Sequence, residues 1–241
     1  MEMSGSQFSW ESYEVQTEDG WILTVFRVTG VPTDQLGSDK PPILIWHGLN
    51  GSGGDMAGWA APFSQKGYDV WFGTSRGAWY SNKHVKDAEG SWSSLKERWD
   101  FSWAEFGVYD VPAVIELIRS VTGKPKVTYM GYSQGATQMY YGLAKKQDYY
   151  AERINRFIAL TTCIYVAPLF DDYEEAVKTY LTYDRLGIYN KFGGDESSAT
   201  VEKVCGVLGA SECEDYGDPE EHGASIQQYM HYAQCAIEGR F

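Results

Sequence analysis

The sequence is poor in basic residues and has no long apolar run, and both shortages exclude classes of protein. Twenty Lys and Arg stand against 33 Asp and Glu in 241 residues, and the net charge of −13 repels phosphate backbones and anionic membrane surfaces. Nucleic acid is therefore not an expected partner. No window reaches the ~18 consecutive apolar residues that span a bilayer, so we expect no transmembrane segment.

The first residues, MEMSGSQFSWESYEV, have neither the basic nor the apolar part of a secretory signal. Because a mature chain would also have lost such a signal, the compartment stays open. We expect a lysosomal or secreted lumen for a mature chain, and otherwise an intracellular place within a complex.

Cysteine is scarce, and the four cysteines contain no Cys-x-x-Cys pair; they are Cys163, Cys205, Cys213 and Cys235. This spacing argues against a zinc site and against thioredoxin-like chemistry, and we expect neither a metal nor another cofactor. Cys205 and Cys213 are close enough to bridge across a short loop, but four reduced, buried thiols fit the sequence equally well.

Hydrophobic residues make up 43% and aromatic residues 15% of the chain, which is the composition of a packed globular protein. Short apolar or β-rich runs alternate with segments of helical spacing. The expected strands are residues 13–17 and 21–28, joined as a hairpin by an Asp-Gly turn at Asp19-Gly20, followed by 42–46, 68–72, 126–130 and 156–160. The expected helices are residues 56–66, 103–122, with a bend or restart at Pro112, and 134–146. This alternation predicts an α/β fold with a mostly parallel sheet and helices on both faces.

The pattern changes after Thr162, where aromatic, acidic and glycine-containing pieces follow one another. Helical spacing returns at residues 198–208 and 224–237, and we expect no further strand. The sequence therefore predicts a core over residues 1–162 and a helical excursion laid over the sheet at 163–241.

The residues Gly131-Tyr132-Ser133-Gln134-Gly135 match the G-x-S-x-G pattern, with an expected strand before them and an expected helix after them. This is the context of a nucleophile elbow, in which two glycines allow a strained turn that lifts the serine above the sheet. The pattern predicts Ser133 as a nucleophile, with Gly131 and Gly135 supporting the turn.

Acyl transfer also requires N–H donors that face the developing oxyanion. The amide of Gln134 follows the nucleophile directly and is the first expected donor. The second is expected in the glycine-rich loop after the strand at 42–46, most naturally at Leu49, with His47 and Gly48 shaping the loop. No lysine follows in the Walker arrangement, which argues against a phosphate-binding loop.

Several segments together resemble the acid lipase family of α/β-hydrolases, which contains gastric and lysosomal acid lipases and sterol ester hydrolases. They are residues 13–23, 47–49, 67–77, 101–106, 109–113 and 131–135. Tyr132 stands where the family usually has histidine. The resemblance implies Ser133 as the nucleophile, Leu49 and Gln134 as oxyanion donors, and a triacylglycerol or sterol ester as the substrate.

The resemblance also covers the excursion, because residues 225–234 resemble a helix found late in the family's cap. It implies that 163–241 is a helical cap or lid. The spacing of Cys205 and Cys213 is similar to that of the family's cap disulfide.

A serine needs a histidine to take its proton and a carboxylate to orient that histidine, and in α/β-hydrolases both follow the serine. Only His222, in an acidic loop, and His231, where the family has a non-catalytic histidine, follow Ser133. His47 and His84 precede it. The acidic candidates lie away from the expected strand ends; they are Asp171, Asp172, Asp184, Asp195 and Asp218.

The chain is therefore expected to stop before the last core strands, which carry the family's acid and histidine. Two hypotheses follow. In the first, a companion polypeptide completes a lipase that hydrolyses lipid esters, and this chain alone is inactive. In the second, the chain is a catalytically inactive structural subunit of a larger assembly. Both predict a protein partner, because an open sheet edge is otherwise a liability.

Overall fold

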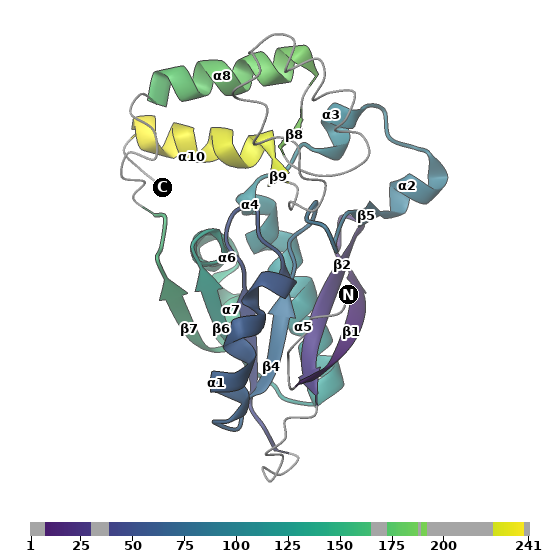
Figure 1. The fold of residues 1–241 in the computed structure, drawn as a ribbon, viewed down its shortest axis with the longest axis vertical. Coiled ribbons are helices and arrows are strands. Elements are labelled where there is room, and N and C mark those ends of the chain that lie inside the picture. Colours follow the sequence, from purple (N-terminus) through teal and green to yellow (C-terminus); the bar gives the residue numbers. More distant parts are fainter. Residues whose placement is uncertain (1–7, 30–38, 165–172, 188, 192–223, 239–241) are drawn as a thin grey trace.

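A twisted sheet runs through the middle of the molecule, with helices on either side of it (Figure 1). The computed structural model describes residues 8–29, 39–164, 173–187, 189–191 and 224–238. The strand order is β1-β2-β4-β3-β6-β7, with a short strand, β5, paired to β2. The elements as a group confirm the predicted α/β fold.

The sheet begins with an antiparallel hairpin of β1 (Ser9–Gln16) and β2 (Trp21–Thr29). Its turn is closed by a hydrogen bond from the amide of Gly20 to the carbonyl of Thr17, and Gly20 has a φ of 100°. Such a backbone conformation favours glycine, which explains the Asp-Gly signal read in the sequence.

The remaining long strands are parallel to one another, as predicted. They are β3 (Pro42–Trp46), β4 (Asp69–Gly73), β6 (Val127–Tyr132) and β7 (Ile154–Leu160). β2 joins them through an antiparallel pairing with β4, and β5 (Lys83–His84) extends β2. Because β3 lies between β4 and β6, the ends of β3 and β6 are neighbours, with Trp46 opposite Gly131.

Both faces of the central strands are buried, because their side chains alternate between two hydrophobic clusters. Leu44 and Trp46 face α5 (Val111–Thr122), whereas Ile43 and Ile45 face the other side. That other side is covered by a 3₁₀ helix, η1 (Gly53–Trp59), and by α1 (Ala60–Ser64). This is why continuous apolar runs, rather than alternating ones, marked these strands.

The expected helix at 103–122 is divided into three pieces. It consists of α4 (Trp103–Glu105), a π-helical turn η2 (Phe106–Asp110) and α5, whose first turn contains Pro112. Proline is tolerated there because its missing N–H has no partner in the first turn of a helix. The bend or restart expected at Pro112 corresponds to the π-helical turn, which ends two residues before it at Asp110.

The π-helical turn packs closely on α6 (Gln134–Lys145), the helix that follows the elbow. A side chain on Gly107 would place its Cβ 2.2 Å from the carbonyl oxygen of Gln138, and one on Gly142 would be 2.6 Å from the carbonyl oxygen of Gly107. Two glycines therefore bring the helix behind Ser133 against the core. α7 (Gln147–Arg153) then leads into β7.

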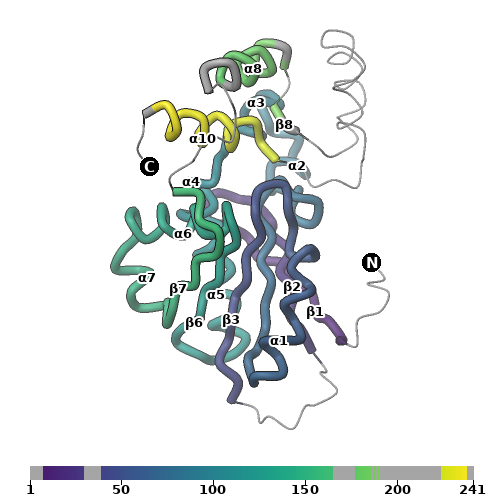
Figure 2. The backbone as a smooth tube through the Cα atoms, turned by 60° about the vertical axis from the view of Figure 1, so that its left-hand side comes forward, coloured from purple at the N-terminus to yellow at the C-terminus, as the bar shows by residue number. Residues whose placement is uncertain are grey.

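Two further helices, α8 (Tyr173–Leu186) and α10 (Ile226–Glu238), lie together beyond the carboxyl ends of the strands, above the core in Figures 1 and 2. Two short helices, α2 (Val85–Glu89) and α3 (Leu95–Arg98), lie near the same end. The helix expected at 224–237 is present as α10, which begins at Ile226, and the helix expected at 198–208 lies outside the described residues.

The expectation of no strand after residue 162 is wrong in one detail. β8 (Asn190–Lys191) pairs with β9 (Ala224–Ser225) in a small sheet of its own. Two-residue strands are too short to produce a periodic signal, so the sequence could not show them. In the part of the chain that the structure describes, no helix combines the length and the apolar character that crossing a bilayer requires.

Candidate active site

Ser133 occupies a sharp turn between β6 and α6. Its φ of 50° and ψ of −116° lie in a region that side-chain-bearing residues rarely adopt, at a cost of about 1–3 kcal/mol. The amide of Ser133 donates to the carbonyl of Leu160 at the end of β7, at 2.9 Å. The half-buried side chain thus stands on a strained junction that the neighbouring strand holds in place.

The two glycines of the motif are required by close backbone contacts. A Cβ on Gly131 would lie 2.4 Å from the carbonyl of Gly135, and a Cβ on Gly135 would lie 2.7 Å from the carbonyl oxygens of Trp46 and His47. Any side chain at either position would therefore push α6 away from β3 and β6. Support of the elbow by these two glycines stays a prediction. Tyr132, at the variable position of the motif, is 44% exposed.

The loop after β3 reaches the elbow. Gly48 approaches Ser133 so closely that a Cβ on Gly48 would lie 3.2 Å from the Ser133 Cβ. The loop turns back at once, because the amide of Gly51 donates to the carbonyl of Gly48 at 3.2 Å, and Asn50 has a φ of 58°. Leu49, the predicted second oxyanion donor, lies inside this turn.

Gln134 is the first residue of α6, and its side chain is buried. The first amides of a helix have no acceptor within the helix, and they carry the positive end of its dipole. An amide at this position directly after Ser133 is suited to receive a negative oxygen.

His47 supports the loop through both of its ring nitrogens. Nδ1 lies 2.7 Å from the carbonyl oxygen of Gly48, and Nε2 accepts a hydrogen bond from the amide of Ser75 at 3.0 Å. These two contacts fit a neutral imidazole ring that carries its proton on Nδ1. The His47 side chain is buried, with 3% of its surface exposed. His47 therefore links the loops after β3 and β4, and its ring nitrogens are not turned to Ser133.

The atom found beside the Ser133 hydroxyl is a sulfur. Cys163 Sγ lies 3.5 Å from Ser133 Oγ, just beyond the end of β7. Cys163 and Cys235 are both half-buried. Sequence reasoning missed this neighbour, because a lone cysteine 30 residues after the serine belongs to no motif.

His84 is bonded elsewhere. Its Nε2 lies 2.8 Å from the carbonyl oxygen of Asp19, and its Nδ1 accepts from the amide of Lys86 at the start of α2. The ring also contacts Trp21 and Trp92. These bonds assign His84 to the packing of the hairpin turn.

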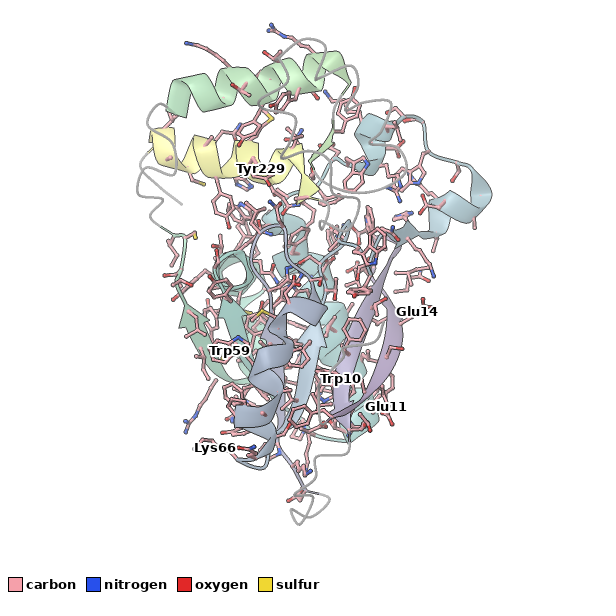
Figure 3. The ribbon with its side chains drawn as sticks, viewed as in Figure 1. Trp10, Glu11, Glu14, Trp59, Lys66 and Tyr229 are labelled. Carbon is pink, nitrogen blue, oxygen red and sulfur yellow. The ribbon has the colours of Figure 1, made fainter. Side chains whose placement is uncertain are left out.

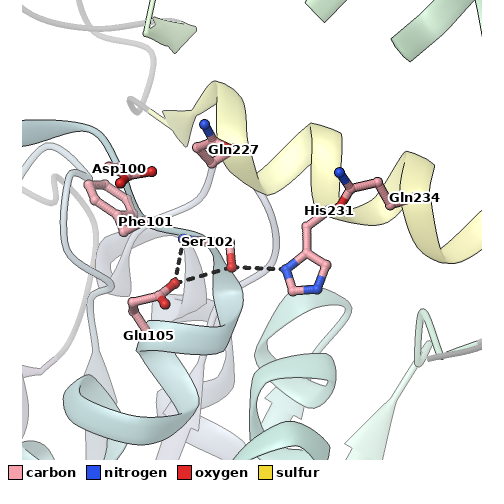
Figure 4. Close-up of a pocket in the computed structure, with 7 residues that line it drawn as sticks. All are labelled: Asp100, Phe101, Ser102, Glu105, Gln227, His231 and Gln234. Carbon is pink, nitrogen blue, oxygen red and sulfur yellow. Dashed lines mark hydrogen bonds between the residues drawn. The ribbon is translucent and has the colours of Figure 1, made fainter. Parts of the chain in front are cut away.

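His231, on α10, belongs to a separate pocket of about 260 Å³ (Figure 4). Its Nδ1 lies 2.9 Å from Ser102 Oγ, and its ring stacks on Trp103 with 3.9 Å between the ring centroids. The Ser102 amide donates a hydrogen bond to the Glu105 carboxylate at 2.7 Å, and the Ser102 hydroxyl donates to the same carboxylate oxygen.

The grouping of Ser102, Glu105 and His231 is not a catalytic triad. Ser102 and Glu105 form the capping box that begins α4, and the carboxylate contacts the serine instead of orienting the histidine. These residues therefore attach α10 to the core, through the contacts of His231 with Ser102 and Trp103.

His231 makes this attachment sensitive to pH. Burial lowers the pKa of His231, against the raising effect of Glu105. The unfolded chain therefore takes up this proton at a higher pH than the folded chain, so stability is lost as the pH falls through about 6.5. We expect His231→Asn to lose less stability between pH 7 and pH 5 than the wild type, as measured by urea unfolding at both values.

A matched control for His231 is Gln227→Ala, since Gln227 lines the same pocket and does not titrate. This variant should keep the pH dependence of the wild type. Equal slopes in His231→Asn and the wild type would contradict the assignment.

The structure describes one of the acidic candidates, Asp184. Asp184, on α8, forms an ion pair with Lys96 at 2.7 Å. The other candidates lie outside the described residues; they are His222, Asp171, Asp172, Asp195, Asp218, Cys205 and Cys213. The described ranges contain no group of side chains that could hold a metal ion.

Two family models match this chain. Residues 41–203, more than half of the chain, match the family model described as alpha/beta hydrolase fold. The chain belongs to the α/β-hydrolase fold family. Residues 3–57 match a second model, described as a partial alpha/beta-hydrolase lipase region. An epoxide hydrolase of the same superfamily from hot-environment metagenomes shares the fold, with a TM-score of 0.51 at 14% identity over 95% of this chain and 70% of that one.

Curated relatives of this α/β-hydrolase are lipases, which confirms the resemblance seen in the motifs. Lipase 1 of Drosophila melanogaster is 34% identical over 96% of this chain and 56% of its own. Gastric triacylglycerol lipase of Rattus norvegicus is 30% identical over 96% of this chain and 65% of its own. The chain spans between 38% and 65% of the length of the first relatives that it matches.

Proposed function

We propose that this lipase-like α/β-hydrolase cleaves lipid carboxylic esters, with Ser133 as the nucleophile. The observation that carries the proposal is the strained turn at Ser133, which stands directly against the Gly48 loop. The kinship with a triacylglycerol lipase supports a triacylglycerol or a sterol ester as the substrate.

The chemistry follows from this arrangement. Ser133 Oγ attacks the ester carbonyl while its proton passes to a base, and the carbonyl oxygen becomes an oxyanion. The backbone amides of Leu49 and Gln134 bind that oxyanion, assisted by the positive end of α6. The base then gives that proton to the departing alcohol, and water, activated by the same base, hydrolyses the acyl-serine to release the fatty acid and restore the Ser133 hydroxyl.

The base is proposed to come from a companion polypeptide, together with the carboxylate that orients it. Support comes from the three histidines that the structure describes, since the ring of each is bonded to another part of the molecule. The outer edge of β7 supports a binding site for such a polypeptide. Among the described strands β7 pairs with β6 alone, and Phe157, Ile158 and Leu160 on it are half-buried.

A fluorophosphonate probe on the native protein tests the proposal, because such probes react with an activated serine. We expect one modified residue in this chain, Ser133, identified by peptide mass spectrometry, and no modification after Ser133→Ala. Ser102→Ala is the matched control and should label normally, because Ser102 belongs to a capping box.

Proteins that remain bound during purification should then be identified. Labelling at Ser133 with a histidine-bearing partner supports the enzyme. An intact assembly in which Ser133 stays unlabelled would contradict it and favour the structural subunit, a role consistent with the engaged histidines.

A further inference from the structure

Two adjacent residues of α10 bind the two segments that carry the proposed oxyanion donors. Gln228 accepts a hydrogen bond from the side-chain amide of Gln134 at 2.9 Å. Tyr229 donates its hydroxyl to Asn50 Oδ1 at 2.7 Å. Figure 3 shows Tyr229 on the side of α10 that faces the core. One helix turn of the cap therefore contacts both the elbow and the loop after β3.

These contacts are sheltered from water. Gln134 and Gln228 are each 2% exposed, and Tyr229 is 8% exposed. Leu49 packs against the cluster that contains Tyr180 and Tyr229, whose rings stack with 5.4 Å between centroids. A hydrogen bond inside such an environment is stronger than one in water, and breaking it leaves a buried polar group without a partner.

The bond from Tyr229 acts on a strained position. Asn50 follows Leu49 directly and has a φ of 58°, so the turn from Gly48 to Gly51 depends on this residue keeping a rarely adopted conformation. A bond to its side chain opposes relaxation of the turn. Since the Leu49 amide lies within the turn, any relaxation would also move that proposed donor.

The Gln228 bond acts in the same way on the other donor. Gln134 is the first residue of α6, so holding its side chain restrains the peptide between Ser133 and Gln134. The two partners are 94 residues apart in the Gln134–Gln228 contact and 179 residues apart in the Asn50–Tyr229 contact. Only the docked position of α10 brings these partners together.

We propose that Gln228 and Tyr229 are positioning residues through which α10 sets the geometry of the oxyanion site. The amides of Leu49 and Gln134 are then aligned when α10 is docked on the core, and they lose alignment when it is displaced. The cap helix thereby has a part in the chemical step, in addition to covering the site. This inference rests on the proposed ester hydrolysis at Ser133.

Kinetics of the native assembly carrying Tyr229→Phe or Gln228→Ala test the inference. Each variant should lower kcat for a soluble short-chain ester by about 10- to 100-fold. Misalignment of an oxyanion donor loses only part of the rate effect that its complete removal would have. KM should change little, because the oxyanion forms after the ester binds.

Tyr232→Phe is the matched control, because it removes the same hydroxyl from the same helix. Among the described residues, the buried Tyr232 hydroxyl bonds to neither Asn50 nor Gln134, and the polar side chain that faces it is Thr137, farther along α6. This variant should keep the kcat of the wild type. Wild-type kcat in both test variants, or an equal loss in Tyr232→Phe, would overturn the inference.

Hydrogen exchange separates failure of this inference from failure of the proposed function. Amides of residues 48–51 and 134–136 should exchange faster in Tyr229→Phe and Gln228→Ala than in Tyr232→Phe, whether or not the assembly hydrolyses esters. An inactive wild type would refute the proposed function alone. Unchanged exchange in these two segments would refute the coupling to α10, even in an active enzyme.

Discussion

If a companion polypeptide supplies the base and acid, as we propose, the 241-residue chain expressed without it is expected to hydrolyse soluble esters at least ~10⁴-fold more slowly than the assembly, because loss of both groups costs ~10⁴ to 10⁶ in rate. The described histidines supply no base, since His47 and His84 bond to backbone groups and His231 bonds to Ser102. The measurement is turnover of a chromogenic short-chain ester by purified chain and by assembly at equal concentration.

Variants make this comparison decisive. The isolated chain should be no faster than its Ser133→Ala form, and adding back the partner should restore turnover only to the chain with an intact Ser133. Rapid turnover by the isolated chain, lost in Ser133→Ala, would show that the chain contains its own base. His222→Ala would then identify that base, since His222 lies outside the described residues.

The second large effect is expected at Arg76, whose replacement by methionine should lower the free energy of unfolding by about 3–5 kcal/mol. Arg76 is 2% exposed and Asp110 is fully buried. Arg76 Nε and Nη2 donate to Asp110 Oδ1 at 2.8 and 2.6 Å, and Nη2 also donates to Asp19 at 2.9 Å. Without the guanidinium, the Asp110 carboxylate would be buried and unpaired.

Arg76 remains charged throughout the accessible pH range. Burial by itself would lower the pKa of Arg76, but the charge of Asp110 and the hydrogen bonds to Asp19 and Asp110 raise it above its usual range. These three residues therefore join three segments: the hairpin turn at Asp19, the loop after β4 at Arg76 and the π-helical turn that ends at Asp110.

Urea unfolding measures the loss, and Lys83→Met provides the comparison. Lys83 pairs with Glu14 at 3.4 Å, but both side chains are more than 60% exposed, so we expect about 0–1 kcal/mol there. Adding Asp110→Asn to Arg76→Met should recover part of the loss, because it removes the unpaired charge. Equal losses in Arg76→Met and Lys83→Met would contradict the buried-charge explanation.

Local sequence patterns predicted most of the core. Continuous apolar runs marked β3 and β4, an Asp-Gly turn marked the β1–β2 hairpin, and Pro112 marked the start of α5. Each of these signals depends on residues within one element, where burial on both faces, a left-handed backbone or a missing N–H restricts the residue type directly.

Local patterns did not predict the pairing of side chains around the site. Cys163 meets Ser133 across β6 and β7, His231 meets Ser102 across 129 residues, and Gln228 meets Gln134 across 94. No sequence period or motif predicts these contacts, because each depends on how whole helices and strands pack against one another.

The local sequence is sufficient to specify the elbow, because Gly131, Ser133 and Gly135 are required by a single strand-to-helix turn whose close backbone contacts admit no side chain at either glycine. The tertiary structure decided what surrounds that serine. It brought the Gly48 loop to the elbow through the pairing of β3 with β6, and it placed α10 over both. Such contacts follow from long-range packing, in which the position of each side chain depends on the burial of many others.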